Sequence, residues 1–78
     1  MNTNYLEAIL QKLIGEKAIQ TQDLAVYLTN PVAIGEHPHI GEEVENKIAK
    51  IDELESRIDT IQKLKSKLYA NEANTTAN

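Results

Sequence analysis

The chain has 78 residues, a formal charge of −4 from 12 acidic and 8 basic side chains, and 41% hydrophobic residues. This length allows one small domain, and no uncharged run approaches the ~20 residues that a membrane-spanning helix needs. We expect a soluble, cytoplasmic protein without a signal peptide.

The hydrophobic core is expected to be thin and aliphatic. Phe, Trp and Cys are absent, and three tyrosines are the only aromatic residues. A core at this length rarely supplies more than ~3–5 kcal/mol, and without cysteine the chain forms neither disulfides nor thiolate zinc sites. The composition therefore predicts further burial against another chain, and no cofactor is expected.

The first predicted element is a short amphipathic helix, Tyr5–Ile14. Its apolar residues recur at the i, i+3, i+4, i+7 spacing of a helical stripe: Leu6, Ile9, Leu10 and Leu13. Asn4 is suited to cap its start, and Gly15 stands where a left-handed residue commonly ends a helix.

A second short helix, of roughly two turns, is predicted between Thr21, a plausible N-cap, and the Asn30-Pro31 pair, which forbids continuation. The stretch Pro31–Ile40 follows, with both prolines and Gly35. These residues restrict or redirect the backbone, so we interpret the stretch as an ordered loop packed by its own apolar residues.

A long helix, Pro38–Ala70, is the strongest predicted element. With Val44 at heptad position a, the a and d positions form a coiled-coil stripe of about four heptads. This stripe is predicted to be a homo-oligomer interface, because such a helix outruns any single-chain core. The expected interface residues are Val44, Ile48, Ile51, Leu54, Ile58, Ile61, Leu64 and Leu68. Lys47 and Lys65 also occupy core positions.

The predicted fold class is all-α: two short N-terminal helices, an ordered Pro/Gly loop and one long C-terminal helix. Residues 1–70 are expected to form a single domain. Residues 71–78 have no apolar periodicity and are expected to be a disordered tail.

The loop is the candidate site for a protein partner or an anionic small molecule, through Asn30, Gly35, Glu36, His37 and His39. The N-terminus of the long helix next to the histidines would suit an anion such as a nucleotide. A native metal site is the weaker interpretation, because histidines two apart on an extended segment point to opposite sides. Solvated or helix-capping histidines are the simplest alternative.

Catalysis and nucleic-acid binding are not expected. The serines and carboxylates of the long helix lie on a solvated surface, where their pKa values suit no acid–base chemistry. Residues Ile9–Leu28 resemble the first two helices of a helix-turn-helix module, but an acidic helix follows where a basic recognition helix should stand. A helix-turn-helix regulator therefore stays only a second alternative.

The segment Asn30-Pro31-Val32-Ala33-Ile34-Gly35-Glu36-His37-Pro38 resembles the NPVGIGEHP-type segment of small uncharacterised proteins of large tailed bacteriophages. The similarity covers about Leu24–Leu64, and Ala33 departs from the glycine of that pattern. It implies a phage accessory protein made in the host bacterial cytoplasm, and it carries over no activity or site residues.

The sequence as a whole predicts a non-enzymatic protein that homo-oligomerises through its long helix and binds a protein partner. An oligomeric binder of a small anionic molecule is the alternative, because symmetric oligomers of short helical chains create pockets between subunits.

Overall fold

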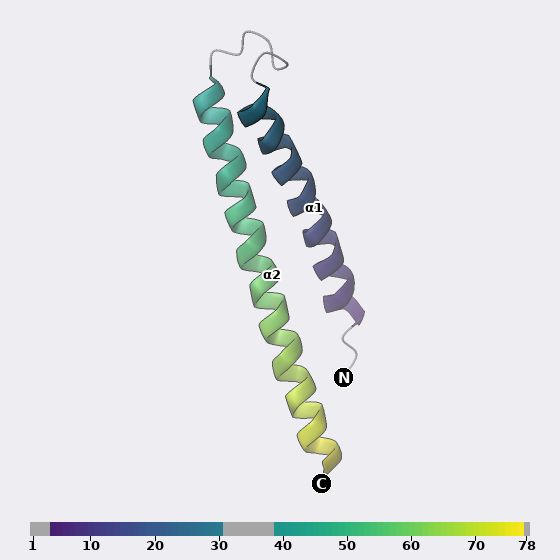
Figure 1. The fold of residues 1–78 in the computed structure, drawn as a ribbon. Coiled ribbons are helices and arrows are strands. Elements are labelled where there is room, and N and C mark those ends of the chain that lie inside the picture. The colour runs from purple at the N-terminus through teal and green to yellow at the C-terminus, as the bar shows by residue number, and fades with distance from the viewer. Residues whose placement is uncertain (1–3, 31–38, 78) are drawn as a thin grey trace.

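The chain folds into a hairpin of two antiparallel helices, α1 (Asn4–Thr29) and α2 (Ile40–Ala77) (Figure 1). The structure, a computed structural model, describes residues 4–30 and 39–77, and for 69–77 it describes the backbone only. The hairpin is narrow and elongated, with extents of 64 × 16 × 15 Å. All-α is therefore right as a class.

The predicted pair of short N-terminal helices is wrong, because α1 is a single helix of 26 residues. Gly15 does not end it: this residue lies in regular helix, and a Cβ added there would have open space beyond the local helix backbone, with no other described atom within 4 Å. Thr21 likewise lies inside the helix and caps nothing. A solvent-facing glycine costs a helix only about 1 kcal/mol, which packing against α2 readily offsets.

Between Gly15 and Thr21 polar residues interrupt the apolar stripe of α1, but the stripe resumes after them on the same face of the helix. The residues of α1 that face α2 continue at alternating steps of three and four through the interruption, where Lys17 and Gln20 occupy the apolar positions. Both side chains are half-buried. The polar stretch that suggested two helices is therefore a polar layer within one.

Backbone and side-chain hydrogen bonds finish both helices at the connection. At the end of α1 the Asn30 amide donates to the Val26 carbonyl at 2.9 Å, and the Thr29 hydroxyl donates to the Ala25 carbonyl. At the start of α2 the Glu43 amide donates to the His39 carbonyl at 3.0 Å. Two acidic residues in this first turn, Glu42 and Glu43, stabilise α2 because their negative charges lie near the positive end of the helix dipole.

The predicted long helix is observed from Ile40, and Pro38 lies outside the described residues. Its helical backbone continues to Ala77, beyond the expected end near Ala70. The disordered tail predicted for residues 71–78 remains a prediction.

The core is small and lies where the two apolar stripes meet. Its buried members among the described residues come equally from the two helices: Leu10, Leu13, Leu54 and Ile61. Leu6 and Ile58 pack against them and are partly buried. Burial of four such side chains contributes at most about 1.5–3 kcal/mol each before the entropy of folding is subtracted.

Replacing Gly15 by Ala tests the continuity of α1. In a continuous helix the change is expected to raise the free energy of unfolding by about 0.5–1 kcal/mol, because alanine restricts the unfolded chain and nothing obstructs its methyl group. Thermal unfolding followed by circular dichroism measures it. A destabilised variant would contradict the continuous helix, since a left-handed residue at a helix end tolerates no Cβ.

Candidate interaction surfaces

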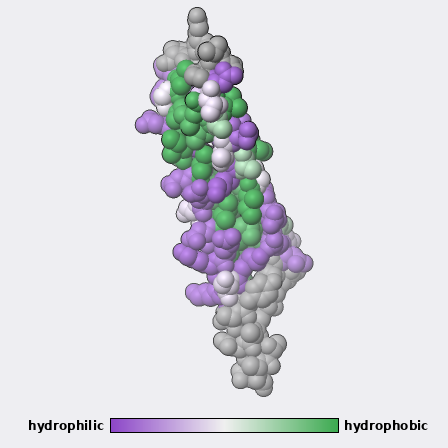
Figure 2. All heavy atoms as spheres, viewed as in Figure 1, coloured by the Kyte–Doolittle hydropathy of each residue, from purple (hydrophilic) through white to green (hydrophobic). Residues whose placement is uncertain are grey.

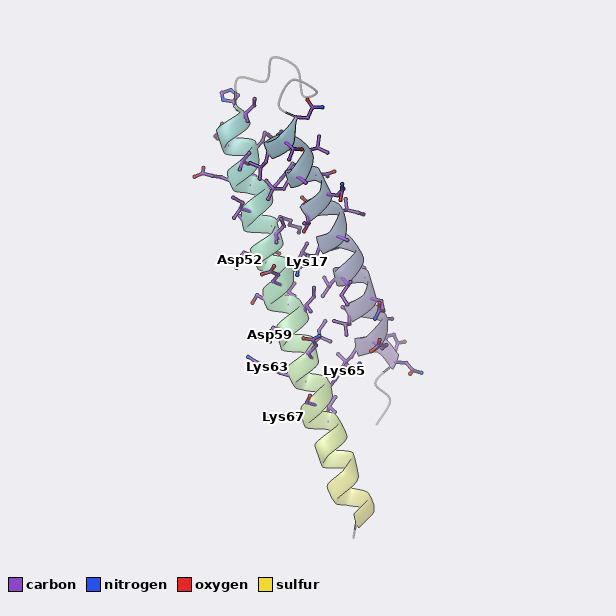
Figure 3. The ribbon with its side chains drawn as sticks, in the orientation of Figure 1. Lys17, Asp52, Asp59, Lys63, Lys65 and Lys67 are labelled. Carbon is purple, nitrogen blue, oxygen red and sulfur yellow. The ribbon has the colours of Figure 1, made fainter. Side chains whose placement is uncertain are left out.

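Three lysines cross from one helix to the other and end at a carboxylate. Lys65 bonds to Glu7, Lys17 lies 3.3 Å from the Glu55 carboxylate, and Lys47 lies 4.0 Å from that of Asp23. Each lysine occupies a core position of its helix, and Lys17 and Lys65 lie between the helices in Figure 3. The residue number rises along α1 as it falls along α2, so the three pairs share one antiparallel register.

Lys47 is the most enclosed of these lysines, with 18% of its side chain exposed. Its ammonium also lies 5.0 Å from the centre of the Tyr27 ring, within range of a cation–π contact. A carboxylate and an aromatic face thus replace part of the water that this charge loses.

The predicted oligomer interface coincides with the face of α2 that α1 covers. Leu54 and Ile61 are buried between the two helices. Partly buried positions continue this face: Val44, Ile51, Ile58 and Leu68. Ile48 and Leu64, at its margins, remain 52% and 43% exposed. A single chain therefore accounts for most of the predicted stripe, and oligomerisation through it remains a prediction.

A larger set of exposed apolar side chains lies on α1. The set comprises Tyr5, Ile9, Ile14, Ile19, Val26 and Leu28, each at least 42% exposed. On a helix of 3.6 residues per turn they fall on two opposite flanks of the face that meets α2. Sequence reasoning missed this distribution, which becomes visible once the helical periodicity is extended through Gly15.

The first flank follows Tyr5, Ile9, Ile19 and Val26, with charged residues between them. We call it the α1 stripe: Tyr5, Ile9, Lys12, Glu16, Ile19, Asp23 and Val26, spaced alternately by four and three residues. Lys12 and Glu16 at its middle form an exposed ion pair at 3.9 Å. This spacing is that of a helix–helix packing seam, distinct from the seam with α2.

A groove of about 450 Å³ lies between the helices beside the α1 stripe. Ile9, Leu13 and Ile61 supply its apolar lining, and Lys12 and Arg57 stand among its polar residues. Arg57 is held by Glu53 on its own helix at 2.6 Å. The groove is open along one side, as a docking site for a protruding side chain would be.

The other flank of α1 carries Ile14 and Leu28. Figure 2 shows apolar side chains gathered in two patches on one face of the hairpin, with hydrophilic side chains between and beside them. A smaller groove, about 310 Å³, is lined by Leu10 with three polar residues, Gln62, Lys65 and Ser66.

The predicted loop site falls largely outside the described residues, which include neither Gly35, Glu36 nor His37. Asn30 continues the hydrogen-bonding pattern at the end of α1. His39 precedes α2, and its exposed imidazole lies 3.3 Å from the Glu42 carboxylate. The His39 side chain is therefore exposed beside a carboxylate of the first turn of α2, and its role in binding remains a prediction.

The described residues, 4–30 and 39–77, allow three other hypotheses to be examined: a metal site, a helix-turn-helix module and a membrane-spanning helix. Within these residues, no group of three or more His, Asp or Glu side chains is placed to hold a metal ion. The turn of a helix-turn-helix module is absent, because α1 runs through it. Neither helix, over these residues, combines the length and apolar character needed to cross a membrane.

The chain was compared with protein-family models, with curated proteins and with solved structures, and none of them matches it.

The pairing of Glu7 predicts a specific acid sensitivity. Hydrogen bonds from Lys65 and from Gln11 at 3.1 Å, with the charge of Lys65, hold the pKa of Glu7 below its ordinary value. A lowered pKa stabilises the fold above the ordinary carboxyl value of about 4.3, and this contribution is lost as the pH falls through the lowered pKa. Glu7→Gln is expected to lower the melting temperature at pH 7 and to flatten its decline between pH 5 and 3.

The matched control is Glu45→Gln. Glu45 is exposed on α2, and no ion pair or side-chain hydrogen bond of it is present in the described part of the chain. Its variant removes the same charge without a cross-helix bond. If the melting temperatures of both variants depend on pH in the same way, the Glu7–Lys65 bond does not contribute to acid stability.

Proposed function

We propose that this chain is a non-enzymatic helical interaction module that self-associates through the flanks of its hairpin. The observation that carries the proposal is the distribution of large apolar side chains: among the described residues, eight are substantially exposed, while four form the buried core. Six of the eight lie on α1. A helix that is apolar on several sides is typical of one that other helices surround.

The amount of exposed apolar surface supports association and not solitary existence. Single exposed hydrophobic residues are ordinary, but rows of them along one element mark interaction sites. Ile19 and Leu28 are each 61% exposed, on opposite sides of α1. A second helix packed on either side would remove these side chains from water.

Arrangement in space also supports the proposal. Two helices bury each other along one line only, whereas bundles of three or more helices enclose a core on several sides. Association of two hairpins would form a four-helix arrangement. This proposal keeps the homo-oligomer predicted from α2 but adds the flanks of α1 as the surface that remains free for it.

The resemblance of Asn30–Pro38 to a phage protein segment supports placing this module among phage accessory proteins. A heterologous protein partner would then use whichever flank the copies leave exposed. The segment supplies no residue role.

The proposal is tested by sedimentation velocity over about 1 to 100 micromolar protein, with thermal unfolding on the same samples. We expect a mass above the 8.7 kDa of one chain and a melting temperature that rises with concentration, because association stabilises the folded state by mass action. A folded species of 8.7 kDa throughout this range would refute self-association.

A further inference from the structure

Between Tyr5 and Asp23 the α1 stripe has a pattern that reads the same when the helix is turned end for end, and Val26 lies beyond this symmetric part. Residues equidistant from position 14 have matching or complementary chemistry: Ile9 corresponds to Ile19, and Lys12 corresponds to Glu16. Tyr5 corresponds in the same way to Asp23, an acceptor for its hydroxyl. A two-fold axis produces this correspondence, because it brings the same surface of two molecules together in reverse order.

We propose that two copies of the chain associate by antiparallel packing of their α1 helices, along the α1 stripe and centred near residue 14. The inference rests on the proposed self-association and names its surface, orientation and register. Ile9 of each copy packs against Ile19 of the other, and Lys12 of each pairs with Glu16 of the other.

Charge complementarity favours this register over its alternatives. In the antiparallel register both central lysines meet a carboxylate of the other copy, which makes four opposite charges alternate around the axis. A parallel arrangement in register would instead place Lys12 against Lys12 and Glu16 against Glu16. Like charges in contact destabilise a helix pair, so the pattern selects the antiparallel orientation.

The groove beside the stripe supplies a place for the most exposed isoleucine. Ile9 and Lys12 line this groove, and in the antiparallel register these positions oppose Ile19 and Glu16 of the second copy. Ile19 would enter the apolar part formed with Leu13 and Ile61. Its side chain, 61% exposed in the single chain, would exchange water for an apolar lining.

The opposite flank lacks such a pattern. Ile14 and Leu28 on it have no pair of opposite charges between them, because the intervening residues at the same flank are Ala18, Thr21 and Ala25. That flank does not specify an orientation for a second copy. It serves as the internal comparison for the experiment.

Two substitutions of equally exposed residues test the surface. Ile19→Asp is expected to convert the dimer to a monomer of unchanged helicity, because it places a charge in the groove of the second copy. Leu28→Asp is the matched control, since Leu28 is also 61% exposed and lies nine residues further, about half a turn around α1. It is expected to leave at least a dimer.

Charge reversal tests the pairing. Lys12→Glu and Glu16→Lys should each weaken the dimer, by an expected tenfold or more in dissociation constant, a change that corresponds to about 1.4 kcal/mol. An equimolar mixture of the two variants should recover a heterodimer, because opposite charges meet again between chains. The intrachain Lys12–Glu16 pair stays broken in both variants, so recovery reports only the contact between copies.

Single cysteines test the orientation, and the chain offers a clean background because it contains no cysteine. Under mild oxidation a mixture of Ile9→Cys and Ile19→Cys should cross-link between the two variants. Each variant alone should cross-link far less, since neither position faces its own counterpart. Cross-linking of each variant with itself would overturn the antiparallel arrangement.

The outcomes separate this inference from the proposal beneath it. A monomeric wild-type chain would overturn both. A wild-type dimer that survives Ile19→Asp, or that Leu28→Asp dissociates instead, would overturn the α1 pairing and leave self-association standing. Loss of the dimer only in Ile19→Asp, with recovery in the charge-reversed mixture, supports the pairing.

Discussion

The whole structure depends on the register in which α1 and α2 meet. Apolar contact supplies most of the free energy, since each buried aliphatic side chain contributes about 1.5–3 kcal/mol and an exposed ion pair about 0–1 kcal/mol. Apolar contact alone, however, does not distinguish one heptad offset from another. The cross-helix pairs of Lys17, Lys47 and Lys65 make that distinction, because an offset leaves a partly enclosed ammonium without its carboxylate.

The two ends of the hairpin are not held equally. The buried residues among those described lie away from the connection: Leu10 and Leu13 are in the first half of α1, and Leu54, next to the Lys17 partner Glu55, lies near the middle of the hairpin. Nearer the connection, the facing residues Leu24, Tyr27 and Val44 are only partly buried, and Lys47 stands among them. Few buried contacts mean a low local free energy of opening, so we expect the connection end to open more readily than the rest of the hairpin.

Periodicity in the sequence predicted the facing stripe of α2 because its aliphatic residues recur without a break. It failed on α1 because Gly15 is of a type that commonly ends a helix and Thr21 of a type that commonly begins one. These signals are worth about 1 kcal/mol each, and packing along a continuous helix exceeds them.

The apolar residues of α2 do not by themselves determine whether α1 of the same chain or a helix of another copy packs against them. The apolar positions of α2 fit a second copy as well as they fit α1, and the length of α1 decides between them. Two short helices would have left the distal part of α2 uncovered, whereas one helix of 26 residues reaches it. The prediction of two short helices in place of α1 and the prediction that a second copy covers α2 therefore have the same origin. Of the residues predicted for the loop site, the structure describes only Asn30 and His39. Both form backbone hydrogen bonds at the helix ends.

Charge imposes the final constraint on how copies of this chain meet. At −4 per chain, any two copies repel one another, and the repulsion is only partly screened at physiological salt. The fold already uses Lys17, Lys47 and Lys65 within the hairpin. On α2, Lys50 is paired with Glu53 at 3.7 Å and Lys63 with Asp59 at 2.8 Å, the latter pair on the side of α2 turned away from α1 (Figure 3).

Lys12 is thus a cation that α1 presents away from the seam, and its exposure of 73% leaves it accessible to a second chain. A contact between two acidic molecules gains most where a cation of each faces an anion of the other, because the local attraction then opposes the overall repulsion. On α1 the antiparallel register achieves this with Lys12 and Glu16, and the isoleucines on either side supply the apolar area. In the proposed dimer, Lys12 and Glu16, which lie 3.9 Å apart within one chain, would each also face the opposite charge of the second copy.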